Sequence, residues 1–171
     1  IELDPYFAKA YNSLGAAWVY LGEYDRAIPH LNRAIDLDPD YADPFLARGS
    51  AYMYRNQEEK ALADFTKAIE LNAEDAAAYT NRAGAYVALN RTEDALADLQ
   101  KAEQLDPDFP MVHINRGAAY LASNQAQKAV ESLTHALELA PDHTLALENR
   151  AEAHRQLENY PAAIADYTRS E

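Results

Sequence analysis

Apolar and small residues recur along the chain at helical spacing, and the same arrangement returns every 34 residues. In the first period Tyr11, Gly15 and Trp18 are spaced i, i+4 and i+7, which places them on one face of a helix. A second set with the same spacing follows: Ala27, Leu31 and Ala34. Each period therefore predicts two amphipathic helices, in which small residues allow close approach and large ones fill the gaps.

The same columns continue through all five periods. The small residue of the first helix recurs as Gly15, Gly49, Ala83, Gly117 and Ala151. A ring three residues later recurs as Trp18, Tyr52, Tyr86, Tyr120 and His154. Polar or glycine-bearing breaks at 21–23, 55–57, 90–92 and 123–125 separate the two helices. Proline at 5, 39, 107 and 141 ends the second helix, and Ala73 takes its place in the remaining period.

On these residues the chain resembles an array of tetratricopeptide repeats, whose period is 34 residues. The resemblance implies an all-α fold, a right-handed superhelical solenoid of antiparallel helix pairs, in one domain over residues 1–171. Repeats are expected at 8–41, 42–75, 76–109, 110–143 and 144–171, with residues 1–7 as the tail of a preceding repeat. Because neither end carries a polar capping helix, we expect the chain to be a fragment of a longer array.

Composition excludes several classes of partner and chemistry. The 171 residues carry 15 Lys and Arg against 28 Asp and Glu, a net charge of −13, which argues against nucleic acid and anionic membranes. There is no cysteine, and no apolar run is long enough to span a bilayer. No signal peptide is visible, so a cytoplasmic location is expected.

Residue spacing also argues against catalysis and metal binding. No two of the five histidines lie at the i, i+4 spacing that lets one helix chelate zinc. No glycine-rich phosphate loop and no nucleophile with a neighbouring base is present. The sequence therefore predicts a protein without a metal, a cofactor or an enzymatic activity.

The resemblance also implies a concave groove lined by the first helix of each repeat. The groove positions are mostly neutral although the chain is acidic, which suits an extended peptide or an amphipathic helix of a partner protein. The apolar contacts expected there come from Tyr20, Met53, Tyr54, Val87, Ile114 and Leu121. The alternative is a structural spacer, or a scaffold segment that associates with itself through its uncapped ends, within a larger multidomain protein or enzyme.

Two polar columns have competing interpretations. Asn81, Asn115 and Asn149 could hold the backbone of a bound peptide, or could be solvated or bonded to a neighbouring loop. An arginine column follows it at Arg48, Arg82, Arg116 and Arg150. It could form an anion-binding track, but we favour ion pairs between packed helices, with Arg82 on Asp64 and Arg116 on Asp98.

Some tetratricopeptide repeats clamp the C-terminal carboxylate of chaperones with Lys and Asn in one first helix, Asn in the next, and Lys and Arg in the third. Asn81 fits the middle position. Leu46 and Ser50 stand at the first pair of positions, and Met111 and Asn115 at the last. We therefore expect no carboxylate-clamp binding of chaperones.

Overall fold

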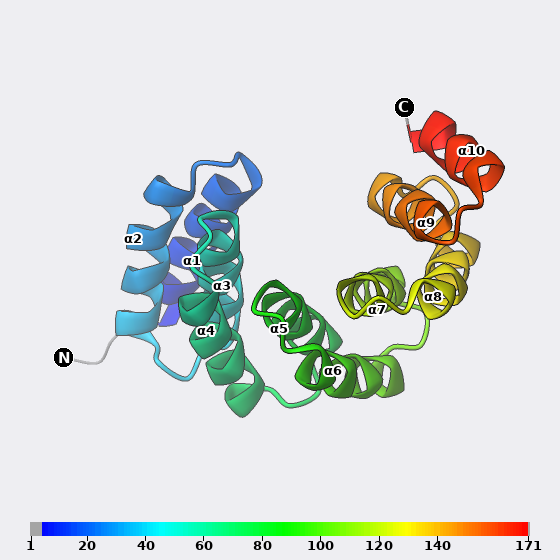
Figure 1. Cartoon of the computed structure of the whole chain (residues 1–171). Coiled ribbons are helices and arrows are strands. Elements are labelled where there is room, and N and C mark those ends of the chain that lie inside the picture. Colours follow the sequence, from blue (N-terminus) through cyan, green and yellow to red (C-terminus); the bar gives the residue numbers. More distant parts are fainter. Residues whose placement is uncertain (1–4, 171) are drawn as a thin grey trace. The chain divides into compact units, whose positions relative to one another are not determined.

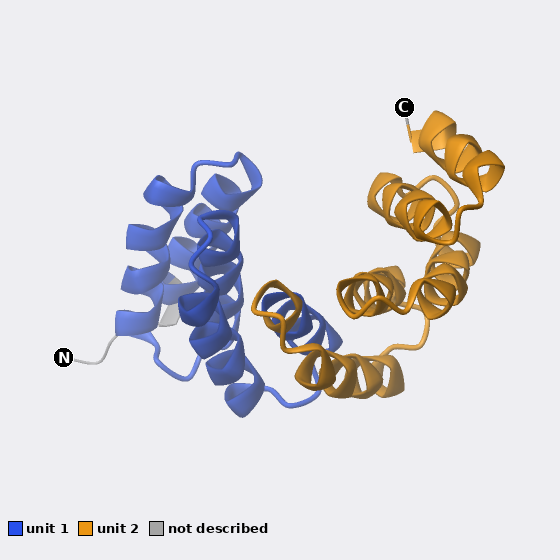
Figure 2. Cartoon of the chain, in the orientation of Figure 1, with its two compact units in different colours: residues 1–85 blue, residues 86–171 orange. Residues whose placement is uncertain are grey.

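The structure, a computed structural model, describes residues 5–170, with side chains from Phe7 to Ser170 (Figure 1). Within residues 5–170 the chain forms ten α-helices joined by short turns, and no β-strand. The chain divides into two compact units, residues 1–85 and 86–171, and the boundary falls within helix α5 (Figure 2).

Unit 1 contains two complete helix pairs and most of a fifth helix. Its elements are α1 (Pro5–Tyr20), α2 (Tyr24–Leu37), α3 (Asp43–Tyr54), α4 (Glu58–Leu71) and the first ten residues of α5 (Ala76–Ala88). Helix α1 packs on α2 and α3 on α4, while α2 and α1 both contact α3. Each repeat is thus a helix pair that packs against the first helix of the next pair.

The start of α1 differs from the prediction. The helix begins at Pro5, so residues 5–7 belong to the first helix of the array and not to the tail of a preceding repeat. Proline is well tolerated in the first turn of a helix, because the N–H that it lacks would have no partner there. Residues 1–4 of the predicted tail lie outside the described residues.

Unit 2 repeats the same packing. Its elements are the end of α5, α6 (Thr92–Leu105), α7 (Pro110–Ala122), α8 (Ala126–Leu139), α9 (Thr144–Gln156) and α10 (Tyr160–Ser170). Helix α7 packs on α8 and α9 on α10, and each second helix again contacts the next first helix, as α6 does with α7 and α8 with α9. Helices α7 and α9 also contact each other.

A glycine facing a bulky residue allows the two helices of a repeat to approach closely. A Cβ atom added to Gly49 would lie 2.5 Å from the ring of Phe65, and one added to Gly15 would lie 2.5 Å from Leu31. Phe65 and Leu31 are both fully buried or nearly so. The small-residue column predicted from the sequence is therefore the place where the paired helices touch.

Every turn between the two helices of a repeat uses one residue in the left-handed region. These residues recur 34 apart: Gly22, Asn56, Asn90, Asn124 and Glu158, with φ of 76°, 52°, 57°, 56° and 57°. Glycine enters this region readily because it has no Cβ atom to crowd the following carbonyl oxygen, and asparagine does so because its short polar side chain can hydrogen-bond locally. Glu158 therefore holds its turn at a conformational cost that the other four repeats largely avoid.

The second helices end in a shared geometry that does not need proline. Asp38, Asn72 and Asp106 have extended backbone and Ala140 has φ and ψ close to theirs, and each donates its N–H to the carbonyl oxygen of the alanine four residues earlier. The side chains of Asp38, Asn72 and Asp106 accept a hydrogen bond from the N–H two residues on. Asn72 keeps this geometry although alanine follows it, because its side chain supplies the same local turn.

We predict that Glu158→Asn raises the free energy of unfolding by about 0.5–1 kcal/mol, because asparagine tolerates the left-handed conformation better. Urea unfolding followed by circular dichroism measures the change. Asn124→Glu is the matched reverse exchange in the preceding repeat, and a loss of similar size is expected. Equal stability of Glu158→Asn and the parent chain would contradict this explanation of the turn.

Candidate functional site

In unit 1 the predicted groove positions of the first two repeats surround an open pocket of about 610 Å³. We call it the tyrosine pocket, and its lining comes from α1, α3, the turn between α1 and α2, and the first residue of α2: Ala16, Val19, Tyr20, Leu21, Gly22, Tyr24, Ser50 and Tyr54. Ala16 and Ser50 occupy the same position of successive repeats, as do Tyr20 and Tyr54, and the contact between α1 and α3 brings them to one pocket.

Two tyrosine side chains of this pocket lie largely in solvent. Tyr20 is 92% exposed and Tyr54 is 67% exposed. The ring of Tyr54 stacks on that of Tyr24, with centroids 4.9 Å apart and an angle of 5° between the planes. The stacked ring of Tyr54 and the exposed ring of Tyr20 both offer apolar area and a hydroxyl group to a ligand. Because stacking already restricts Tyr54, its side chain loses little conformational entropy when a ligand binds.

Tyr24 and Leu21 were not among the predicted site residues. Tyr24 begins a second helix, whereas the prediction considered first helices alone. The sequence feature that could have predicted this contact is the 30-residue separation of Tyr24 and Tyr54. Tyr24 begins one second helix and Tyr54 ends the next first helix, and their rings stack in the folded chain.

An ion pair joins the same two helix ends. Arg55 follows Tyr54 and Asp25 follows Tyr24, and the Arg55 Nη1 to Asp25 Oδ1 distance is 2.7 Å. The Asp25 side chain is 80% exposed, so the pair contributes little to stability. It does place one charge of each sign next to the stacked tyrosines.

The other apolar residues predicted for the groove are less accessible than Tyr20 and Tyr54. Met53, Val87 and Leu121 are half-buried. Ile114 is fully buried, in a cluster with Leu133 of α8. Its side chain fills the core of unit 2 and is not available to a ligand, which corrects its assignment as a contact residue.

The predicted asparagines are half-buried members of first helices. Among the described residues, neither Asn81 nor Asn149 has a hydrogen-bond partner for its side chain, whereas Asn115 takes part in an interaction within the chain. In unit 2, Asn115 and Asn149 occupy the same position of the contacting helices α7 and α9. The amides of Asn81 and Asn149 therefore have hydrogen-bonding capacity to spare.

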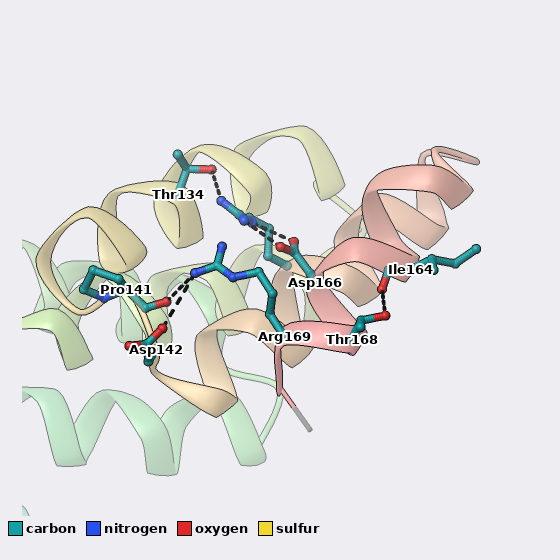
Figure 3. Close-up of polar contacts among 8 residues, drawn as sticks. Thr134, Pro141, Asp142, Ile164, Asp166, Thr168 and Arg169 are labelled. Carbon is teal, nitrogen blue, oxygen red and sulfur yellow. Dashed lines mark hydrogen bonds and ion pairs between the residues drawn. The ribbon is translucent and has the colours of Figure 1, made fainter.

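The arginine column connects packed helices, but through other partners than predicted. Arg48 donates from Nε and Nη2 to both carboxylate oxygens of Asp64, at 2.8 and 2.7 Å, and from Nη1 to Asn32 Oδ1 at 2.6 Å. Arg150 forms the same bidentate pair with Asp166, at 2.7 and 2.6 Å, and donates to Thr134; both partners are labelled in Figure 3. Each of these two arginines bonds the second helix of its own repeat and that of the preceding one.

This geometry overturns the predicted pair of Arg82 with Asp64, because Asp64 is bound to Arg48 sixteen residues earlier. Arg82 donates instead to Thr66 Oγ1, at 3.4 Å. The predicted partner of Arg116 was also wrong. Arg116 binds Glu103 through both terminal nitrogens, at 3.2 and 2.7 Å, because Ser132 stands where its own repeat would place an aspartate.

Burial and charge act together on these groups. The hydrogen bond to Asp64 raises the pKa of Arg48, and the hydrogen bond from Arg116 lowers the pKa of Glu103. The side chains of Arg48, Arg116 and Arg150 are only 17–19% exposed. Their guanidinium groups therefore tie helices together and do not form a free track for anions.

A buried histidine lies close to this network in unit 2. His113 is 3% exposed, and the ring of His135 lies edge-on to it at 4.3 Å between centroids. Burial, followed by the neighbouring His135, lowers the pKa of His113, against a hydrogen bond to the Pro107 carbonyl that raises it. Glu103 of α6 and Arg116 of α7 also act on this ring.

Between residues 5 and 170, no three histidine, aspartate or glutamate side chains are grouped so that they could hold a metal ion. No described helix combines the length and apolarity needed to cross a bilayer.

With this geometry in view, the chain can be placed among known families. Sequence models described as tetratricopeptide repeat match residues 8–41, 42–75 and 114–171, and one described as TPR repeat matches residues 84–123. The chain therefore belongs to the tetratricopeptide-repeat family. No curated protein sequence matches it.

Solved structures agree on the fold. A thermophilic tetratricopeptide-repeat protein of Thermus thermophilus is 25% identical, with a TM-score of 0.87 over 95% of this chain and 89% of that one. PilF of Pseudomonas aeruginosa is 24% identical, with a TM-score of 0.82 over 95% and 74%. MamA of Desulfovibrio magneticus is 18% identical, with a TM-score of 0.77 over 99% and 95%.

These matches confirm the predicted fold class, an all-α solenoid of about five tetratricopeptide helix pairs. They also place the chain among proteins that serve as scaffolds for protein interaction and that typically lack catalytic activity.

We predict that Arg48→Met lowers the free energy of unfolding by about 3 kcal/mol, because it leaves the buried Asp64 carboxylate without a cation. The double variant Arg48→Met, Asp64→Leu should recover most of this loss in urea unfolding. Lys67→Met is the control, since it removes an exposed pair with Glu70 worth about 0.5 kcal/mol or less. A double variant no more stable than Arg48→Met would argue against a buried unpaired charge as the cause.

The lowered pKa of His113 predicts a pH-dependent stability. Below a pH of about 6.5 the unfolded chain binds a proton that the folded chain takes up only at lower pH, so the free energy of unfolding falls as the pH drops. His113→Phe should flatten this fall between pH 7.5 and 5.5, measured by urea unfolding. His30→Phe controls for the loss of one histidine, and an unchanged slope in His113→Phe would rule out this source.

Proposed function

We propose that the chain is a non-catalytic binding module that takes an extended peptide or an amphipathic helix of a partner protein on the concave side of its first helices. The observation that carries the proposal is the tyrosine pocket, an open hollow formed by groove positions of two successive repeats. Large exposed aromatic rings beside a hollow are typical anchors of protein interfaces, where a few aromatic side chains supply most of the binding energy.

The polar part of the proposal rests on the asparagine column. A primary amide has one acceptor and two donors, and so can bond the C=O and N–H of one peptide unit. Asn81 would then hold the backbone of a peptide bound in unit 1, and Asn115 and Asn149 that of a peptide bound in unit 2, without reading its side chains. Such contacts favour an extended ligand whose sequence is set mainly by the side chain that enters the tyrosine pocket.

The proposal includes the chemistry of the partner. The groove positions carry few charges, so we expect a ligand rich in apolar and aromatic residues and not a strongly acidic tail. Leu46 and Met111 stand where a carboxylate clamp needs lysine, so chaperone tails that end in acidic residues should not bind tightly.

Selection of peptides from a phage-displayed random dodecapeptide library on the immobilised chain tests this function. We predict enriched peptides with apolar or aromatic residues. Tyr20→Ala and Tyr54→Ala should each weaken them about tenfold or more, as loss of an aromatic anchor does. Asn81→Ala, in the same unit as the tyrosine pocket, should weaken binding by about 1 kcal/mol, roughly fivefold, the typical net value of one hydrogen bond.

Tyr160→Ala is the matched control, because Tyr160 is 57% exposed but lies at the start of a second helix. Binding that survives Tyr20→Ala and Tyr54→Ala at full strength would move the binding surface elsewhere. A selection that yields no specific peptide would count against the groove as a peptide site.

A further inference from the structure

A second open pocket, of about 710 Å³, lies inside unit 2 at the junction between the repeat of α7 and α8 and the repeat of α9 and α10. Its volume is typical of ligand pockets. The lining comes from the turn before α8, the first residues of α8, the last residue of α9 and the residue after it: Asn124, Gln125, Ala126, Gln127, Lys128, Gln156 and Leu157. We call it the amide pocket, because four of these side chains end in a primary amide.

The same junction of unit 1 shows what this space can hold. Ala126 and Gln156 stand three periods after Tyr24 and Tyr54, whose rings stack on each other. In unit 2 a methyl group therefore takes the place of the Tyr24 ring. The other second helices all begin with a larger residue than alanine: Tyr24, Glu58, Thr92 and Tyr160.

The amide pocket lies between two described repeats. In unit 1 the tyrosine pocket at the same junction is open although α4 and α5 follow α3 along the chain. Tyr54 at the end of α3 is 67% exposed there. A repeat that follows thus leaves this junction accessible to a ligand.

Two of the amides in the pocket have hydrogen-bonding capacity to spare. Among residues 5–170, neither Asn124 nor Gln127 has a hydrogen-bond partner for its side chain, and both residues are exposed. The amide of Gln156 donates to Glu152 Oε1 at 3.1 Å, which leaves its carbonyl oxygen available. The pocket therefore offers donors and acceptors to a polar group of a ligand.

Charge narrows the class of ligand. The lining residues include one cation, Lys128, and no carboxylate, in a chain of net charge −13. The Lys128 amine donates to Gln125 Oε1 at 2.7 Å and lies 5.5 Å from the centroid of the Tyr120 ring, so two contacts hold it in place. Leu157, 41% exposed, adds apolar area. A neutral side chain with a ring and a polar end matches this lining, whereas Lys128 would repel a basic one.

We propose that the amide pocket is a second binding site, separate from the tyrosine pocket, and that it takes the side chain of a tyrosine from a peptide segment of a partner protein. The ring would lie over Ala126, in the space that Tyr24 fills in unit 1, with one face against the planar amide of Gln156. The hydroxyl group would bond to the amides of Asn124 and Gln127. The partner thus supplies the ring that the chain itself supplies in unit 1.

Titration of the full chain with the blocked tripeptide acetyl-Gly-Tyr-Gly-amide tests the proposal. In proton–nitrogen correlation spectra we expect saturable shifts of the backbone amides of residues 124–128 and 156–157. The same tripeptide with phenylalanine in place of tyrosine should bind about fivefold more weakly, as the loss of one hydrogen bond does. Equal binding of the two tripeptides would contradict the role of the amides.

Two substitutions change the pocket in opposite directions. Ala126→Tyr should fill it from within and abolish the saturable shifts, and folding should persist because Tyr24 and Tyr160 occupy this position in α2 and α10. Gln156→Tyr should strengthen binding of the tyrosine tripeptide about fivefold, because it supplies the stacking ring that Tyr54 provides in unit 1. A misfolded variant could not produce this gain.

Ala97→Tyr is the matched control, because it adds the same ring at an exposed position of α6, and it should bind the tripeptide like the parent chain. Tyr20→Ala, which tests the tyrosine pocket, should also leave these shifts unchanged, so the two sites can fail separately. A parent chain without saturable shifts at residues 124–128 and 156–157 would overturn the proposal. So would binding that Ala126→Tyr leaves at full strength.

Discussion

The close approach of two helices over a residue without a side chain is the constraint on which the rest of the molecule depends. Gly49 leaves just enough room for the Phe65 ring, and Gly15 does the same for Leu31. This contact sets how the two helices of a repeat lie against each other, and therefore which residues of the first helix remain on the groove side. Tyr20 and Tyr54 reach solvent from the ends of α1 and α3 because the other faces of those helices pack against neighbouring helices.

The arginine column adds a second, polar level to the same packing. A guanidinium group such as that of Arg48 spans three helices, since it bonds Asp64 on one side and Asn32 on the other. A planar fork with several donors suits this position better than lysine, which could not satisfy both helices with fixed geometry. The repeat array therefore combines an apolar contact within each helix pair with an ionic contact that reaches the preceding pair.

Most of the fold could be predicted from the sequence, because period, small-residue column and turn residues all express local geometry. The partners of Arg82 and Arg116 could not, since a long side chain can reach either neighbouring helix and the choice depends on atomic distances. The same limit applies to the groove. Ile114 and Tyr20 both occupy predicted groove positions, but one is buried and the other is exposed. The stack of Tyr24 on Tyr54 joins two repeats, so it follows from packing and not from spacing within one helix.

The left-handed turn of the last repeat bears on the motions of the molecule. In a linear array each repeat is held mainly by its neighbours, so local opening is easiest where fewest contacts must break. Helix α10 follows the strained Glu158 turn and is covered by α9 on one side, while Ile164 and Tyr160 face solvent. Backbone amides there should exchange with deuterium sooner than those of α8, which lies between α7 and α9. Loosening of unit 2 would then begin at its final helix and spread toward α7.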